Sequence, residues 1–448
     1  MRGWLVAIVV VAACDDAPRP SPPVPVAIDP EARARDAFLG DRGFRREALE
    51  RSLVNPDNGY SRDRLAGYAL ADTGWDLLPV WNPRSVPMTR ALVEQLREGA
   101  LRLPEDAAPL VGGDAPDDWA ALGERVFFEL PLRRDDALAA ALLDAARAES
   151  LGLFMAADGT YPGLVAFEDT DGSTRVGITC ALCHAAKDGD SVRAGRARRT
   201  LDYGTARLDH QARTRDPIPA SLADRMQRWG PGRADITGDD DEDPVAIPDL
   251  WRVLELATLT QAGTLRLADE ALAADERRAA NLVVLAIRQE TQIIQAAGER
   301  TRPPRELAWA LASYVAALAP PTRPPTTRAL AQRGEQLFAS HCDRCHRGPN
   351  LGGASIDAAK VGTDRALADS RARGTGNLRV APLLAVAAAA PYFHDGTVPT
   401  LDAVLDPARL AADYRGGVRG PGAIAGHAFG TDLPAADREA LVVFLATL

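Results

Sequence analysis

The sequence predicts an all-α fold in which two related helical domains follow an N-terminal extension. The main observation is an internal repeat: residues 123–127 (GERVF) match residues 334–338 (GEQLF), and each copy precedes a Cys-x-x-Cys-His motif. After each motif a second pair matches, LWRV at 250–253 and LLAV at 383–386, and each leads at the same distance to a Gly-Thr pair. Matched features in the same order indicate duplicated domains. Chance similarity between alanine- and leucine-rich helices is the alternative.

Helical periodicity supports this class. Leu330, Gly334, Leu337, Phe338 and His341 recur at steps of three and four, which places them on one face of a helix. Each copy also closes with an amphipathic stripe, formed by Leu307, Leu311, Tyr314 and Leu318 in the first and by Leu441, Phe444, Leu445 and Leu448 in the second. The predicted organisation is a signal peptide at 1–14, a proline-rich tether at 15–30, an N-terminal extension at 31–122, a first domain at 123–319, a linker at 320–326 and a second domain at 327–448.

Composition and charge narrow the class of protein. The chain has 448 residues, of which 46% are hydrophobic and 25% are charged, as in ordinary globular domains. Its formal net charge of -10 argues against nucleic acid as a partner, because nucleic acid selects basic surfaces. An acidic chain is compatible with a basic redox partner but does not establish one.

The first fourteen residues have the pattern of an export signal. One arginine precedes a short apolar run that ends in small residues and is too short to span a bilayer. Residues 11–14 (VAAC) resemble a bacterial lipobox, in which the cysteine takes a diacylglycerol. We therefore expect lipid attachment at Cys14, a membrane anchor, and a lipoprotein of the bacterial cell envelope that faces the periplasm or the cell surface. An ordinary signal peptide that contains a cysteine is the alternative.

The other four cysteines form two Cys-x-x-Cys-His motifs, the attachment pattern of c-type haem. Two thioether bonds would tether each haem, and the adjacent histidine would bind its iron. The predicted residues are Cys180, Cys183 and His184 for the first haem and Cys342, Cys345 and His346 for the second. Zinc is a weaker alternative because neither motif has a second ligand pair at finger spacing. A thioredoxin-like dithiol would need a flanking strand and helix, where the sequence has glycines.

Residues 391–401 (PYFHDGTVPTL) resemble the signature of the bacterial di-haem cytochrome c peroxidase superfamily. That superfamily also includes the methylamine dehydrogenase maturation enzyme and the di-haem rubber oxygenases. The resemblance covers roughly 123–448, and the interval from Phe128 to Cys180 is longer than in the peroxidases. It implies two cytochrome c-like domains whose haems face a shared interface. The N-terminal haem would meet the oxidant, and the C-terminal haem would pass electrons.

The chain departs from the peroxidases at the second haem. They supply a methionine soon after the His-Asp-Gly motif, but residues 401–411 contain none. Instead, His427 stands between glycines shortly before the last helix, which is more similar to the rubber-oxygenase branch, where the second haem has two histidines. We therefore predict His427 as the second ligand of the iron at His346. An imidazole in place of a thioether should lower the haem potential. A surface-loop histidine is the alternative.

Three further candidates remain open at this stage. The resemblance implies that His394 is a hydrogen-bonding group near a haem propionate, and it is the competitor of His427 as iron ligand. His210 could cap the first iron, but its neighbours Asp209 and Arg213 suit an exposed loop equally well. The acidic run at 239–243 could bind calcium, or it could be a solvated loop.

The predicted function is that of an exported di-haem oxidoreductase. Its C-terminal haem would exchange electrons with a donor or acceptor protein, and its N-terminal haem would react with hydrogen peroxide or dioxygen. A non-catalytic di-haem electron-transfer protein and a structural lipoprotein with inert haems are the alternatives. The ligation of the first iron distinguishes them, because an open position supports catalysis and two strong ligands support a carrier.

Overall fold

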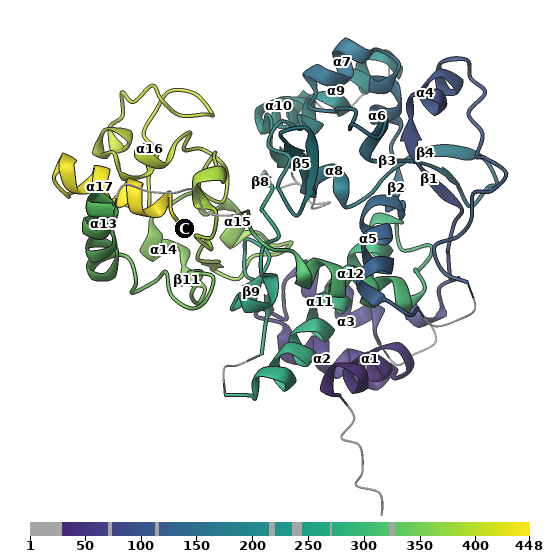
Figure 1. Cartoon of the computed structure of the whole chain (residues 1–448), viewed down its shortest axis with the longest axis horizontal. Helices are drawn as coiled ribbons and strands as arrows, with labels where there is room; N and C mark the ends of the chain where they lie inside the picture. Colours follow the sequence, from purple (N-terminus) through teal and green to yellow (C-terminus); the bar gives the residue numbers. More distant parts are fainter. Residues whose placement is uncertain are drawn as a thin grey trace, which may run out of the picture.

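The computed structural model describes residues 29–448 except for the stretches 70–73, 113–115, 215–219, 235–243, 269–270 and 322–327. Figure 1 shows two lobes, a larger one that begins at the N-terminus and a smaller one formed by the C-terminal part of the chain. The predicted signal peptide with Cys14, most of the tether and linker, and the acidic run at 239–243 lie outside the described residues. Within the described part, no helix is long and apolar enough to cross a membrane.

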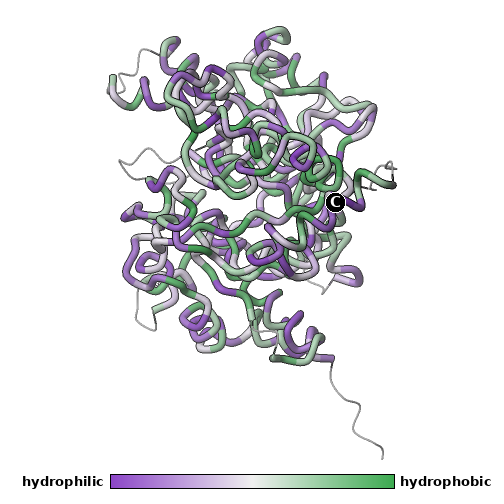
Figure 2. Tube along the Cα trace, turned by 90° about the vertical axis from the view of Figure 1, so that its left-hand side faces the viewer, coloured by the Kyte–Doolittle hydropathy of each residue, from purple (hydrophilic) through white to green (hydrophobic). Residues whose placement is uncertain are grey.

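Helices form the frame of the larger lobe. α11 (Ala274–Ala296) packs against α12 (Arg305–Ala317), α1 (Pro30–Gly40) and α2 (Arg42–Ser52), and α12 packs closely on α5 (Trp119–Glu129). Along most of the trace in Figure 2, hydrophilic and hydrophobic residues alternate, as expected of helices with one buried face. The shorter helices of this lobe are α3 (Gly59–Gly67), η1 (Trp75–Leu77), α4 (Arg90–Arg97), α6 (Asp136–Leu142), α7 (Ala145–Ser150), α8 (Ala181–His184), α9 (Tyr203–Thr214), α10 (Ala220–Trp229) and η2 (Val253–Glu255).

A four-stranded antiparallel sheet in the larger lobe corrects the predicted all-α class. Its strands, in spatial order, are β1 (Ser85–Thr89), β3 (Thr160–Glu168), β4 (Thr174–Ile178) and β2 (Arg133–Arg134). β3 contains β-branched and aromatic residues, and Asp-Gly pairs at 158–159 and 171–172 form the turns before β3 and β4. Three of the four strands, β2, β3 and β4, therefore lie in the long interval between Phe128 and Cys180.

The described residues also form four two-stranded antiparallel ladders. Their strands are β5 (Ala185–Asp188) with β6 (Ser191–Ala194), β7 (Arg233–Ala234) with β8 (Val245–Ala246), β9 (Thr258–Leu259) with β10 (Leu265–Arg266), and β11 (Ile356–Asp357) with β12 (Asn377–Leu378). These ladders are short and connect the helices, so helices still provide the main packing of both lobes.

The smaller lobe is built on the contact between its first and last helices. α13 (Arg328–His341) and α17 (Ala435–Leu445) pack together, and Leu337, Phe338 and Leu441 are buried between them. Both helices coincide with the amphipathic stripes predicted from the sequence, which confirms that part of the prediction. The other helices of the lobe are α14 (Ala358–Val361), α15 (Ala366–Asp369), η3 (Val386–Ala388), α16 (Leu401–Leu405) and η4 (Pro407–Leu410).

The repeated glycine explains how the helices of each pair cross. In the larger lobe, a Cβ atom added at Gly123 would lie 2.6 Å from the Cβ of Tyr314 and closer still to the carbonyl oxygen of Ala310. The ring of Phe127 packs on the ring of Tyr314 with 5.4 Å between centroids. Only a residue without a side chain permits this close approach of α5 to α12.

The second copy repeats this crossing. A Cβ atom added at Gly334 would lie 2.6 Å from the Cβ of Phe444 and closer still to the carbonyl oxygen of Ala440. The rings of Phe338 and Phe444 are again 5.4 Å apart. Equivalent residues therefore make equivalent contacts in both lobes, which confirms the predicted internal repeat.

The segments after the two haem motifs match in their backbone as well. Arg252 and Ala385 take the same position in the two copies and have φ angles of 48° and 55°. Thr260 and Phe393 also correspond, with φ angles of 69° and 71°. Left-handed conformations are uncommon for residues other than glycine, so two matched pairs support a common origin of the two loops.

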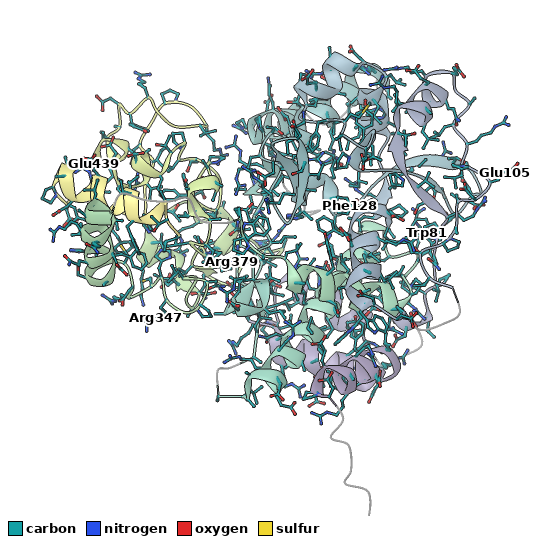
Figure 3. The ribbon with its side chains drawn as sticks, in the orientation of Figure 1. Trp81, Glu105, Phe128, Arg347, Arg379 and Glu439 are labelled. Atoms are coloured by element: carbon teal, nitrogen blue, oxygen red, sulfur yellow. The ribbon has the colours of Figure 1, made fainter. Side chains whose placement is uncertain are left out.

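The lobes meet through a reciprocal pair of backbone hydrogen bonds. The amide of Ala246 donates to the carbonyl of His394 at 2.8 Å, and the amide of Arg379 donates to the carbonyl of Gln261 at 2.9 Å. Ala246 and Arg379 are equivalent in the repeat, as are Gln261 and His394. Each lobe therefore donates one of these hydrogen bonds and accepts the other through equivalent residues, as in an isologous interface. Figure 3 shows Arg379 between the two lobes.

The N-terminal extension is joined to the larger lobe by buried charges. The hydroxyl of Tyr68 donates to the carboxylate of Glu290 on α11, and both side chains are buried. Arg305 lies 3.0 Å from Glu290, and its guanidinium also pairs with Asp76. Asp76 in turn accepts from Arg45 at 3.0 Å. The network ties the extension to the helices that support the first haem motif.

Candidate haem sites

The first Cys-x-x-Cys-His motif lies where β4 ends and α8 begins, so a strand and a helix do flank it, contrary to the expectation from its glycines. Nδ1 of His184 lies 3.1 Å from the carbonyl oxygen of Pro248 and donates to it in the neutral ring. Burial lowers the pKa of His184 to about 4, so the imidazole is neutral at ordinary pH. A neutral ring with Nδ1 engaged presents Nε2 as its free lone pair, which is what a metal-binding histidine needs.

A buried arginine holds the chain around this motif. The guanidinium of Arg198 donates to the carbonyls of Ala185 at 2.9 Å, Pro162 at 2.8 Å and Ala181 at 3.2 Å, while its backbone amide donates to Cys183. Burial lowers the pKa of Arg198 to about 10, which leaves it charged at neutral pH. Nothing in the sequence around Arg198 marks this role, because its partners are backbone carbonyls that come together only in the fold.

None of the four cysteines of the motifs is in a disulfide. Burial raises the pKa of Cys180 to about 12 and the pKa of Cys183 and Cys342 to about 11. A redox dithiol or a thiolate pair for zinc works through a lowered pKa. The environment therefore disfavours both alternatives and is compatible with thioether attachment.

The second motif follows the end of α13. Nδ1 of His346 lies 3.1 Å from the carbonyl oxygen of Leu351, the same arrangement as at the first motif. Burial lowers the pKa of His346, so this ring too is neutral. The ring of His427 lies opposite, with 6.3 Å between centroids and 64° between the ring planes. A metal held at about 2 Å from a nitrogen of each imidazole requires roughly 6 Å between ring centres, so the pair fits an iron.

His427 has the features of a metal ligand. Its Nδ1 atom is buried without a hydrogen-bond partner, and its φ angle of 44° is left-handed. Burial, with smaller contributions from His346 and Arg409, lowers the pKa of His427 to about 4. An unpaired buried nitrogen costs free energy, and an iron at this ring would compensate for it. The residues present at the second motif therefore fit a haem.

The structure separates the other candidate histidines from this pair. His394 lies at the interface of the lobes, where its carbonyl accepts from Ala246, and burial lowers the pKa of its ring. His210 lies in α9 next to Asp209, which pairs with Arg147 at 2.5 Å. Neither ring faces a haem-motif histidine as His427 faces His346.

Arg379 is a further candidate that the sequence analysis missed. Its Nε atom is buried without a partner, and its Nη2 atom makes one long bond of 3.4 Å to Oε1 of Gln261. Burial lowers the pKa of Arg379 to about 10, so it remains a cation at neutral pH. A carboxylate such as a haem propionate would satisfy the free donors. The sequence held no signal for this role, which depends on the meeting of the two lobes.

Comparisons with known proteins agree with this geometry. A family model described as RoxA-like, cytochrome c-like matches residues 379–415. The chain is 31% identical over 130 residues to cytochrome c peroxidase Ccp of Escherichia coli (strain K12), and this match spans 26% of the chain and 24% of the relative. The chain thus covers about a quarter of that relative's length. Together these matches confirm the predicted resemblance to the di-haem cytochrome c peroxidase superfamily.

Two solved structures are also similar to the chain. A MauG-like protein associated with microbial copper homeostasis is 17% identical, with a TM-score of 0.34, over 78% of this chain and 95% of that one. Hydrazine synthase of Kuenenia stuttgartiensis is 14% identical, with a TM-score of 0.35, over 85% of this chain and 98% of that one. The family and peroxidase matches support haem cofactors and, as the general class, a cytochrome c-like haem oxidoreductase.

Proposed function

We propose that this chain is an exported oxidoreductase with two covalent c-type haems, one for electron transfer and one for peroxide or dioxygen chemistry. The observation that carries the proposal is an asymmetry between the motifs. His346 is paired with a second imidazole, and His184 has no such ring partner among the described residues. Haem, when bound, supplies the redox and oxygen chemistry.

The site in the smaller lobe is suited to relay electrons. His346 and His427 are both neutral through burial, and Nδ1 of His427 is buried without a hydrogen-bond partner. Two imidazoles would occupy both axial positions and leave no room for a substrate molecule. Thr375 and Arg379 form hydrogen bonds with backbone groups of the larger lobe, so the relay site is mechanically tied to the other motif.

The site in the larger lobe is suited to bind a small oxidant. The stretch of the first copy that corresponds to the His427 loop, residues 281–302, contains no histidine or methionine and lies largely in α11. With no second strong ligand from this stretch, the iron held by His184 would have a position available to peroxide or dioxygen. The name of the Escherichia coli relative, a peroxidase, favours hydrogen peroxide of the two.

Ligand-binding spectra of the purified protein test the proposal. We expect one low-spin haem that refuses carbon monoxide and one haem that binds carbon monoxide when reduced or cyanide when oxidised. His427→Ala should make the second haem high-spin and open to carbon monoxide, whereas the control His210→Ala should leave that haem unchanged. Two low-spin haems that refuse ligands in both redox states would replace the catalytic function by that of an electron carrier.

The location and partners are part of the same proposal. Haem is joined to Cys-x-x-Cys-His motifs outside the cytoplasm, which agrees with the signal-like residues 1–14 and with lipid attachment at Cys14. An anchored protein of the cell envelope would exchange electrons with another redox protein there. Calcium at residues 239–243 stays a prediction from the sequence.

A further inference from the structure

Arg409, in η4, is a fully buried cation in the smaller lobe. Its Nε donates to the carbonyl of Val404 at 3.1 Å, and its Nη1 donates to the carbonyls of Ile424 at 2.7 Å and Gly426 at 2.9 Å. Its Nη2 donates to the carbonyl of His427 at 2.7 Å. A single guanidinium therefore forms hydrogen bonds to several carbonyls of the loop that carries His427.

The hydrogen-bond acceptors of Arg409 are backbone carbonyls, and no carboxylate is hydrogen-bonded to it among the described residues. Among the described residues no ion pair includes it, and the nearby Asp406 caps the amide of Ala408 at 2.9 Å instead. Its Cζ atom lies 5.2 Å from the centre of the Phe393 ring, whose face also favours a cation. Burying an unpaired charge is costly. A neutral hydrogen-bond donor could hold the loop without that cost, so the charge itself points to a second role.

The loop itself needs to be held. The φ angle of His427 is left-handed, a conformation that is unfavourable for a residue with a side chain. A Cβ atom added at the preceding Gly426 would overlap the backbone of Thr363. The amide of His427 donates to the carbonyl of Val361 at 2.8 Å. The backbone of His427 is thus fixed at both its amide and its carbonyl, and Arg409 holds the carbonyl.

We propose that Arg409 positions His427 against His346 and that its buried charge raises the reduction potential of the haem at this site. The inference rests on the proposed assignment of His427 as an iron ligand. A cation in a low-dielectric interior favours the state that has gained an electron, and outer groups of this kind tune haem potentials. Arg409 would offset part of the low potential expected from two imidazole ligands.

Two substitutions separate the two roles. Arg409→Met removes both the charge and the hydrogen bonds, and Arg409→Lys keeps the charge but cannot reach all four carbonyls. Arg333→Met is the matched control, because Arg333 is exposed in the same lobe and pairs with Asp437 at 3.0 Å. Electron paramagnetic resonance reports the spin state of the holoprotein, and a spectroelectrochemical titration reports its potentials.

We expect both Arg409 variants to lose low-spin signal at the second haem and to bind carbon monoxide there. Added imidazole should restore the low-spin state, and under that condition the potential of Arg409→Met should lie below that of the parent, while Arg409→Lys stays close to it. Arg333→Met should match the parent in spin state and in potential.

The outcomes are distinguishable from failure of the proposed function. If His427→Ala leaves the spectra unchanged, the ligand assignment is wrong and the role of Arg409 falls with it. If His427→Ala opens the haem but both Arg409 variants keep the parent's low-spin signal, the positioning role is refuted. Equal potentials of Arg409→Met and the parent in imidazole refute the electrostatic role, and Arg409→Lys decides the same points if the methionine variant does not fold.

Discussion

The close crossing of α13 and α17 makes Gly334→Ala a sharp test of the fold. The added methyl group would lie 2.6 Å from the Cβ of Phe444, whereas carbon atoms pack at about 3.5 Å or more. Relief requires the two helices to separate, because the still closer contact is with a backbone carbonyl oxygen, at Ala440, which has no rotamer to change. The core between the helices, which includes Phe338, would then lose contacts.

The expected cost follows from two opposing effects. Overpacking a well-packed contact costs about 3 kcal/mol at the upper end of its usual range, and alanine in place of glycine returns about 1 kcal/mol of helix propensity. We therefore expect Gly334→Ala to lower the free energy of unfolding of the smaller lobe by about 2 kcal/mol, measured by urea denaturation followed by circular dichroism. Gly123→Ala should cost the larger lobe a similar amount.

Gly40→Ala is the matched control for this experiment. Gly40 lies at the end of α1, and no atom comes within 4 Å of a Cβ added there. The control should be neutral or stabilising by up to about 1 kcal/mol. Parent-like stability of Gly334→Ala would refute the reasoning, because it would mean that the helices do not cross at this glycine.

Three further predictions concern attachment and stability. Changing Cys180 and Cys183 to alanine should halve the haem stain that stays with the protein on denaturing gels, and full stain would refute two covalent haems. Cys14→Ser should release the protein from membranes or leave its signal uncut, and an unchanged fractionation would exclude lipid attachment there. Tyr68→Phe should cost about 1–3 kcal/mol in denaturant titrations, because buried Glu290 loses a hydrogen-bond donor. A variant as stable as the parent would show that this bond contributes nothing.

The parts of the fold that were predictable are those encoded by local pattern. The stripe from Leu330 to His341 has helical spacing and forms α13, and the glycine at position 334 lies at the helix crossing. The haem motifs were recognisable because two thioether bonds and an axial imidazole require cysteines and histidine at one short spacing. His427 was accessible through the nearby glycines, which let the chain approach a flat ring closely.

The parts that were missed depend on contacts between distant segments. The pairing of β1 with β3 joins the N-terminal extension to the inserted strands, and nothing at Ser85–Thr89 alone indicates its partner. The Asp-Gly turn at 171–172 was a signal for the hairpin of β3 and β4 that the sequence analysis did not use. Arg409 carried no signal at all, because its acceptors are backbone carbonyls, which every residue has.

The two lobes are related by the internal repeat but differ at the position that faces the motif histidine. Two copies that share a helix crossing, left-handed turns and reciprocal interface bonds would be expected to hold their haems alike. They differ at the position facing the motif histidine: one copy presents His427 on a loop gathered by a buried guanidinium, and the corresponding stretch of the other lies largely in α11 and has no histidine or methionine. Under the proposed function, this difference would leave one haem closed and the other open to an oxidant, while the contacts between the lobes are kept. That division is what a protein needs if one haem stores an electron and the other uses it.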